Sequence, residues 1–166
     1  MGTFYLKMAS NIIAKKFYSD LEEAWTKNTI QSFYVKNAVK YDDCVESYNW
    51  KYINDYCSNL LKQYLLEDNS ALHVKDINIL DFGCGSGKTG LSLMESGFQN
   101  ITGIDASSEM VEIAKSKNIY RELQVGTVTN TEHFDVGDSI FEALICVGCF
   151  SSVSYTHLTL PTICSV

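Results

Sequence analysis

The chain has 166 residues, 46% of them hydrophobic, and a formal net charge of −7. This length suits one domain built on one core, and the acidic balance offers no basic surface for nucleic acid, although it permits a basic protein partner. No apolar run approaches the roughly 18 residues of a membrane span, and the N-terminus lacks a signal-peptide pattern, so we expect a soluble, cytoplasmic protein that does not contact membranes.

Six cysteines fit a reducing compartment in which thiols persist. Cys146 and Cys149 form a C-x-x-C pair, but a structural zinc site needs a second such pair, so we interpret both as packed thiols. The three histidines, His73, His133 and His157, are too scattered to form a ligand set. The sequence therefore predicts no metal site.

Residues 1–70 are predicted to form a helical, tyrosine-rich extension. Two sets of apolar residues recur at spacings of three and four, and each set marks one face of a helix. The first set is Ile13, Phe17, Leu21 and Ala24, and the second set is Trp50, Ile53, Cys57, Leu60 and Tyr64. We expect both faces to be packed in a core.

Residues 77–90 carry the most informative pattern of the chain. A short apolar run reaches Asp81 and then breaks into a turn with Gly83, Gly85 and Gly87 at alternate positions. Because glycine lacks Cβ, this turn can adopt conformations forbidden to other residues and lie directly against a ligand. The Asp81 carboxylate can accept hydrogen bonds from an ammonium or hydroxyl group of that ligand.

A second apolar run, residues 101–105, also ends in an acid, Asp105. An acid at the end of the next parallel strand is where a doubly wound sheet binds ribose hydroxyls. The two acids and the glycine turn together predict an adenosine-type ligand at one edge of the sheet.

Two other nucleotide-binding loops must be weighed against this pattern. A phosphate-binding P-loop needs glycine where this chain has Phe82, which excludes an ATPase of that kind. The dinucleotide spacing G-x-G-x-x-G does occur at Gly85, Gly87 and Gly90, so an NAD(P)-dependent oxidoreductase stays an alternative. Asp81 favours a ligand with a cationic amino acid tail, because a carboxylate beside the loop would repel a pyrophosphate.

From residue 77 onward, strands alternate with helices, which predicts a Rossmann-like, doubly wound parallel α/β sheet. A helix is expected over residues 87–96, with Leu91 and Met94 facing inward and Gly97 ending it. The next helix begins at Ser107 as its N-cap and turns Met110 and Ala114 inward. The last two strands are expected at residues 122–125 and 141–147.

The glycine loop and its two acids resemble motif I and the following acidic motif of class I S-adenosylmethionine-dependent methyltransferases. The residues that carry this resemblance are Asp81, Gly83, Gly85, Gly87 and Asp105. Residues 41–153 are similar to the front part of the methyltransferase-like protein 27 (Williams-Beuren region) group, through the strings 41–43, 103–107 and 141–145. Glu142 replaces the Asp that is usual in the family, and we expect the longer acid to be tolerated at a strand entrance.

The resemblance implies S-adenosyl-L-methionine as the cofactor. In the family, the segment before the second helix folds over the cofactor as a lid, which would place Tyr41 against its methionine end; simple packing of this ring is the alternative. Met110 would border the adenine, and the backbone of Thr127 and Val128 would face the adenine edge. The predicted cofactor-binding residues are Tyr41, Asp81, Phe82, Gly83, Cys84, Gly85, Gly87, Asp105, Ala106, Met110, Thr127, Val128 and Val147.

Class I methyltransferases continue with a fifth strand and an antiparallel hairpin, whereas this sequence stops after four predicted strands. Residues 154–166 do not resemble the family, and we expect them to be foreign to a truncated chain, with a divergent natural tail as the alternative. The predicted organisation is an N-terminal helical lid (1–70), a partial Rossmann-like cofactor-binding core (71–153) and a non-family tail (154–166).

The predicted function belongs to the complete parent protein: methyl transfer from S-adenosylmethionine to a small-molecule or protein acceptor. Alignment of the acceptor with the sulfur supplies most of the rate, and no side chain can be assigned as a general base, so the catalytic set is left open. Two alternatives are the NAD(P)-dependent oxidoreductase and a non-catalytic, cofactor-binding relative that acts as a scaffold. The acceptor and the oligomeric state are not predicted.

Overall fold

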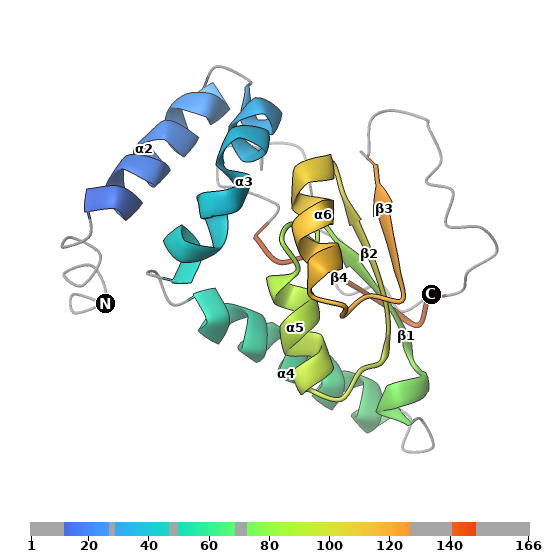
Figure 1. Cartoon of the computed structure of the whole chain (residues 1–166). Helices are drawn as coiled ribbons and strands as arrows, with labels where there is room; N and C mark the ends of the chain where they lie inside the picture. Colours follow the sequence, from blue (N-terminus) through green and yellow to red (C-terminus); the bar gives the residue numbers. More distant parts are fainter. Residues whose placement is uncertain (1–11, 27–28, 47–49, 69–72, 127–140, 149–166) are drawn as a thin grey trace, which may run out of the picture.

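Four parallel strands form the central sheet, in a computed structural model that describes residues 12–26, 29–46, 50–68, 73–126 and 141–148. The strands are β1 (Asn78–Phe82), β2 (Asn100–Asp105), β3 (Glu122–Val125) and β4 (Ala143–Ile145). They lie in the order β3-β2-β1-β4, and each neighbouring pair is parallel (Figure 1). The predicted Rossmann-like α/β fold is confirmed.

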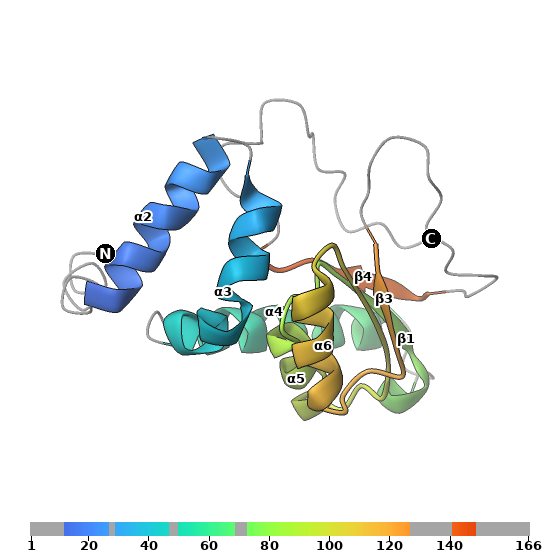
Figure 2. The same ribbon diagram turned by 45° about the horizontal axis from the view of Figure 1, so that its top comes forward.

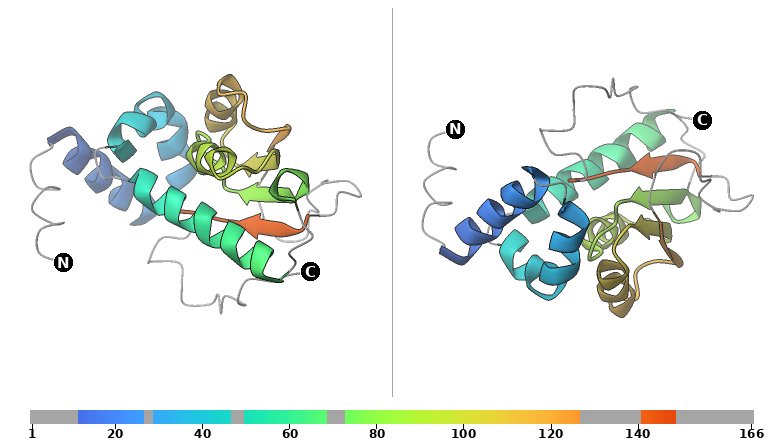
Figure 3. Two further views of the ribbon diagram at one scale, coloured as in Figure 1. Left: turned by 90° about the horizontal axis from the view of Figure 1, so that it is seen from below. Right: turned by 90° about the horizontal axis from the view of Figure 1, so that it is seen from above.

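The helices lie to one side of this sheet in Figures 1 and 2, with α2 (Ile12–Thr26) farthest from the strands. The helices are α2, α3 (Ile30–Glu46), α4 (Trp50–Asp68), the short 3-10 helix η1 (Val74–Asp76), α5 (Lys88–Glu95) and α6 (Ser108–Ser116). α5 and α6 lie side by side against the sheet, and α4 runs along α5 and beside β4 in both views of Figure 3. None of the helices in the described ranges combines the length and hydropathy needed to cross a lipid bilayer.

The direction of the strand order changes at β1. β2 pairs with one side of β1, and β4 pairs with the other, so Asp81 is in register with Gly103 on one side and Ile145 on the other. In open α/β sheets, ligands bind outside the carboxyl ends of the strands at this kind of switch point. The topology therefore places the candidate site at the loop that follows β1.

The sheet core is a cluster of fully apolar side chains on β1, β2 and the segments around α5. Its buried members are Ile77, Ile79, Leu93, Phe98, Ile101, Ile119 and Ile145. Burying aliphatic side chains of this size stabilises each by about 1.5–3 kcal/mol relative to exposure. The cluster supports β1 and β2, the two strands that carry the predicted site.

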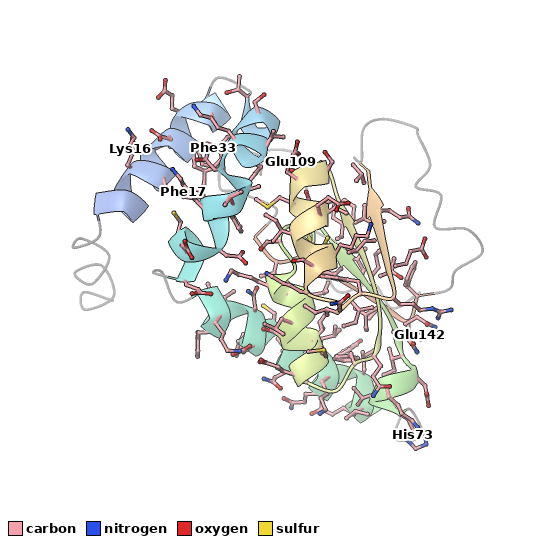
Figure 4. All side chains as sticks on the ribbon, in the orientation of Figure 1. Lys16, Phe17, Phe33, His73, Glu109 and Glu142 are labelled. Carbon is pink, nitrogen blue, oxygen red and sulfur yellow. The ribbon has the colours of Figure 1, made fainter. Side chains whose placement is uncertain are left out.

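A second, separate cluster joins α2 and α3. It contains Phe17, Ala24, Phe33 and Cys44, with Leu21 packed against it. Figure 4 shows Phe17 beside Phe33, and their ring centroids lie 5.0 Å apart in an edge-to-face contact. The predicted apolar face of the first helix is confirmed for Phe17, Leu21 and Ala24, whereas the side chain of Ile13 lies outside the described residues.

The predicted apolar face of α4 was wrong. Ile53, Leu60 and Tyr64 are exposed, and the side that faces α5 instead buries Asn54 and Ser58. The physical reason is a polar helix-helix contact: Thr89 Oγ1 donates to Asn54 Oδ1 at 3.3 Å, and Ser92 Oγ donates to Asp55 Oδ1 at 2.6 Å. The spacing of apolar residues cannot locate the buried face of α4, because polar side chains make the contact with α5. Of the predicted face, only Cys57 contacts the sheet core, and the side chain of Trp50 lies outside the described residues.

The inward face of α5 was also predicted wrongly. Leu91 and Met94 are 36% and 45% exposed, while Leu93 is fully buried. The helix begins at Lys88. Its buried residues, which form the inner face, are Thr89, Gly90, Ser92 and Leu93. Its predicted end is confirmed by Gly97, whose φ of +104° is in the left-handed region.

The predictions for α6 are confirmed, and the predicted last strand is present as β4 with shorter bounds. Ser107 is the N-cap of α6, since its Oγ accepts a hydrogen bond from the Met110 N–H at 3.3 Å, and Met110 and Ala114 are buried as predicted. β4 is shorter than the predicted 141–147. Glu142 just before it accepts a hydrogen bond from the Asn78 N–H at 2.6 Å, so the longer acid ties β4 to the start of β1.

The predicted domain boundaries at residues 70 and 153 fall outside the described residues. They stay predictions.

Tyr120, between α6 and β3, fills the space between the sheet and α5. A Cβ added to Gly90 would lie 2.3 Å from the Tyr120 hydroxyl oxygen, and one added to Gly103 would lie 2.9 Å from its ring. The ring therefore occupies room that two glycines leave open. Gly90, the third glycine of the dinucleotide spacing, faces this ring, so its presence has a packing cause.

We expect Gly90→Ala to reduce the free energy of unfolding by about 1–3 kcal/mol, because the new methyl group overlaps Tyr120 in a closed space. Urea denaturation followed by circular dichroism measures this change. Met94→Ala, on the exposed side of the same helix, is the control and should stay within about 0.5 kcal/mol of wild type. Equal stability of Gly90→Ala and wild type would show that Tyr120 is free to move aside.

Candidate functional site

The loop between β1 and α5 has the backbone that the glycine pattern predicted. Gly83, Gly85 and Gly87 have φ values of +70°, +52° and +91°, a region that residues with Cβ rarely adopt. The loop is fixed to the next strand because Gly83 N–H and Cys84 N–H both donate to the carbonyl of Ile104, at 2.8 and 3.0 Å. A Cβ added to Gly85 would meet nothing within 4 Å. Gly85 is thus the open face of the loop.

Asp105 connects this loop to the start of α6. Its Oδ2 accepts a hydrogen bond from Gly85 N–H at 2.8 Å, and its Oδ1 accepts one from Ser107 N–H at 2.9 Å. Burial raises the pKa of Asp105, and the N–H groups of Ser107, Gly85 and Ala106 oppose this rise. The acid predicted to hold the ligand is therefore also the residue that joins two strand-end loops.

Asp81 lies beneath the loop rather than on its open face. Its side chain is 1% exposed, and Oδ2 accepts a hydrogen bond from the Tyr120 hydroxyl at 2.7 Å. Oδ1 is buried without a hydrogen-bond partner among the described residues. The pKa of Asp81 is raised to about 7, chiefly by burial and also by the nearby charge of Asp105, while the Tyr120 hydroxyl and the Gly90 N–H lower it. The two predicted acids thus lie close enough to influence each other.

A small cavity of about 40 Å³ opens beside the loop, with room for about three water molecules or one end of a ligand. Its walls are Tyr41, Asn54, Gly83, Cys84, Gly85, Ser86, Lys88, Thr89 and Val147. It brings together five of the predicted residues: Tyr41 from the N-terminal helices, three loop residues and Val147 after β4. Tyr41 also contacts Phe17, with ring centroids 6.0 Å apart, so its ring packs against the N-terminal cluster while it lines the cavity. Its contact with a cofactor stays a prediction.

The other predicted residues lie elsewhere. Asp81, Phe82, Gly87, Asp105, Ala106 and Met110 do not line this cavity, although all lie at the same sheet edge or in the segments that begin there. Thr127 and Val128 lie outside the described residues.

Sequence reasoning missed four cavity residues: Asn54, Ser86, Lys88 and Thr89. Three of them, Ser86, Lys88 and Thr89, belong to the loop and the first turn of α5. Their positions next to Gly85 and Gly87 in the sequence could have predicted that they line the cavity. Asn54 had no such signal, because it comes from α4 and reaches the cavity only through the helix packing.

The Cys84 thiol is buried within the loop. Burial, followed by the charges of Asp81 and Asp105, raises its pKa well above the ordinary value, which keeps the thiol protonated and a poor nucleophile. Cys84 therefore acts here as a small side chain that fits the turn. Cys149 lies outside the described residues, so the C-x-x-C pair is not described as a unit.

His73 is exposed and lies at the opposite end of the molecule from Glu109, which stands in the first turn of α6 beside the candidate site (Figure 4). His133 and His157 lie outside the described residues. In the parts of the chain that the structure describes, no three His, Cys, Asp or Glu side chains gather into a possible metal site.

Comparison with known proteins gives one family match and several relatives. The methyltransferase domain family matches residues 79–164, slightly more than half of the chain. This range runs past residue 154 and so includes most of the segment for which we expected no family resemblance.

Among curated proteins, methyltransferase-like protein 27 of Homo sapiens is 30% identical over 90 residues, which cover 50% of this chain and 36% of that protein. The ubiquinone biosynthesis O-methyltransferase of Rickettsia akari (strain Hartford) is 28% identical over 88 residues, 51% of this chain and 35% of that protein. The chain thus spans about a third of the length of the curated relatives it matches.

Among solved structures, the plantazolicin methyltransferase BpumL in complex with SAH is similar with a TM-score of 0.52 and 18% identity. The match covers 81% of this chain and 50% of that chain. At this identity, the likeness concerns the fold.

The raised pKa of Asp81 predicts a specific pH dependence of stability. Because the folded-state pKa, about 7, is above the unfolded value, the contribution of Asp81 is fully present below about pH 4 and is lost as the pH rises through 7. Wild type should therefore lose stability relative to Asp81→Asn between pH 4 and pH 7, by an amount on the order of a few kcal/mol. Urea unfolding of both proteins across this range measures the difference.

Tyr120→Phe is a second variant for this experiment. It removes the hydrogen bond that lowers the pKa of Asp81, so the loss of stability should still begin near pH 4 but continue to higher pH than in wild type. Parallel stability curves for wild type and Asp81→Asn would show that Asp81 does not titrate in this range.

Proposed function

Since the chain belongs to the methyltransferase domain family, we propose that it is the cofactor-binding part of an S-adenosylmethionine-dependent methyltransferase. The observation that carries this proposal is the glycine loop with a carboxylate under it, Asp81, and a second one, Asp105, bonded to Gly85. The NAD(P)-dependent alternative has no support in the matched relatives, and Gly90 of its fingerprint faces Tyr120.

The site fits this cofactor by charge. The buried carboxylate of Asp81 lies near the partly buried carboxylate of Asp105, and Oδ1 of Asp81 has no hydrogen-bond partner among the described residues. A buried, unpaired carboxylate oxygen costs free energy, and a cationic ligand that donates hydrogen bonds relieves that cost. S-adenosylmethionine carries an ammonium and a sulfonium, whereas the pyrophosphate of a dinucleotide would add negative charge beside both acids.

Individual residues are proposed to hold the cofactor as follows. Gly85 N–H and Ser107 N–H each donate to a different oxygen of Asp105, and a carboxylate oxygen can accept more than one donor, so Asp105 would bind the ribose hydroxyls. The open face of Gly85 would lie against the ligand, and Tyr41 would stand at its methionine end. Met110 and the backbone of Thr127 and Val128 would border the adenine.

When bound, the cofactor supplies an already activated methyl group. The protein then binds and orients the two reactants and excludes water, because holding the acceptor in line with the sulfur supplies most of the rate through proximity. The residues around the cavity are suited to this role: Tyr41 covers one side, and Val147 provides an apolar wall after β4. No side chain is proposed as a general base.

The acceptor is proposed to be a small molecule or a protein. The names of the relatives refer to different biosynthetic contexts, ubiquinone and plantazolicin, and therefore select no single acceptor. The six cysteines support a proposed location in the reducing cytoplasm.

The proposal is tested by calorimetric titration with S-adenosylhomocysteine and, separately, with NAD. We expect the first ligand to bind and the second not to bind. Asp105→Asn should weaken S-adenosylhomocysteine binding by about 1–3 kcal/mol, because the ribose loses a charged acceptor. Glu112→Gln, an exposed acid on α6, is the matched control and should bind as wild type does.

Preferential binding of NAD would overturn the proposal. Binding without methyl transfer to any compound in an acceptor panel, tested with the full-length protein, would instead support the scaffold alternative.

A further inference from the structure

Asp42 of α3 is a single carboxylate that joins the N-terminal helices to the glycine loop. It accepts hydrogen bonds from the Ser86 hydroxyl in the loop and from the Lys117 ammonium after α6, the latter at 2.8 Å. Lys88, the first residue of α5, lies 3.9 Å from the same carboxylate and 3.0 Å from Glu46. Asp42 thus accepts hydrogen bonds from two segments that follow it by 44 and 75 residues, and forms an ion pair with a third, Lys88.

This group is partly shielded from water. The side chains of Asp42 and Lys117 are 28% and 25% exposed, whereas the surface pair of Lys115 and Glu112 is 70% and 72% exposed. Exposed ion pairs contribute little, because water and salt screen them and their side chains lose entropy. A carboxylate with several donors at a partly buried position is screened less and is held in one geometry.

The two hydrophobic clusters do not join α3 to the glycine loop. One cluster lies between α2 and α3, and the other lies against the sheet. Figures 1 and 2 show α2 on the outside and α3 between α2 and α6. α3 also contacts α6, and each of these helices has buried apolar side chains, among them Ala38 of α3 and Met110 of α6. The polar contacts of Asp42 add a direct connection between α3 and the loop.

The residue before Asp42 lines the candidate cofactor cavity. Tyr41 shares that cavity with Gly85, Ser86 and Lys88, and two of these three, Ser86 and Lys88, also interact with Asp42. A displacement of α3 from the loop would move Tyr41 away from the cavity and open it to solvent.

We propose that Asp42 is a positioning residue: it anchors α3 to the glycine loop so that Tyr41 closes the cofactor cavity. This inference rests on the proposed function for its ligand, but the anchoring itself is a property of the protein without ligand. Because the anchor is ionic, the closure is sensitive to ionic strength.

The test compares Asp42→Asn with Asp43→Asn, which removes the same charge at the exposed neighbouring position. Calorimetric titration with S-adenosylhomocysteine at 50 mM NaCl should show affinity about tenfold weaker for Asp42→Asn than for wild type, and unchanged for Asp43→Asn. At 1 M NaCl the tenfold difference should shrink to about threefold or less, because salt screens the anchor in wild type. A merely structural loss would leave the difference independent of salt.

Hydrogen exchange of residues 30–46 without ligand is the second measurement. The backbone amides of residues 30–46 should exchange faster in Asp42→Asn than in wild type or in Asp43→Asn. The exchange of the amides in β1 and β2 should be the same in all three proteins. Lys117→Met removes a hydrogen-bond donor of Asp42 and should speed the exchange of residues 30–46 in the same way. This variant replaces Asp42→Asn in the experiment if Asp42→Asn does not fold.

Equal exchange in all variants, or equal affinity and salt dependence, would overturn the anchoring proposal. Absence of S-adenosylhomocysteine binding in wild type would overturn the proposed function alone, since the exchange experiment would still decide whether Asp42 anchors α3.

Discussion

The site depends on one interaction, the bridge that the Asp105 carboxylate makes between Gly85 N–H and Ser107 N–H. These two groups belong to the loops that leave adjacent parallel strands, and nothing in the local sequence brings them together. A carboxylate that accepts two backbone N–H groups is a strong, charge-assisted connection. It fixes the open face of the glycine loop relative to the start of α6, and so defines the edge at which a ligand can lie.

A second constraint acts from below the loop. Tyr120 fills the room that Gly90 and Gly103 leave, and its hydroxyl satisfies one oxygen of Asp81. The other oxygen is buried without a partner among the described residues, close to the charge of Asp105. The loop is thus supported by a buried acid at an electrostatic cost, which is the kind of local conflict that functional sites retain. A cationic ligand is the simplest way to offset it.

The N-terminal helices are attached differently. α2 and α3 share their own aromatic cluster, whereas their junction with the loop uses Asp42 and its donors. α4 is intermediate, because it combines apolar contacts to the sheet core with hydrogen bonds to α5. A core of apolar side chains therefore holds the strands, and polar contacts orient the helices that surround the cavity.

The sequence by itself determined the glycine loop, the two acids at strand ends, the Ser107 cap and the parallel sheet, because each is encoded by a short local pattern of residue type and spacing. Only the tertiary structure decided which faces of α4 and α5 are buried, that Tyr120 lies under the loop, and that Asn54 and Lys88 reach the cavity. Those facts arise from contacts such as Tyr120 with Asp81 and Asp42 with Lys117, which join positions 39 and 75 residues apart. Apolar periodicity cannot predict these contacts, since they are hydrogen bonds and an ion pair rather than hydrophobic packing.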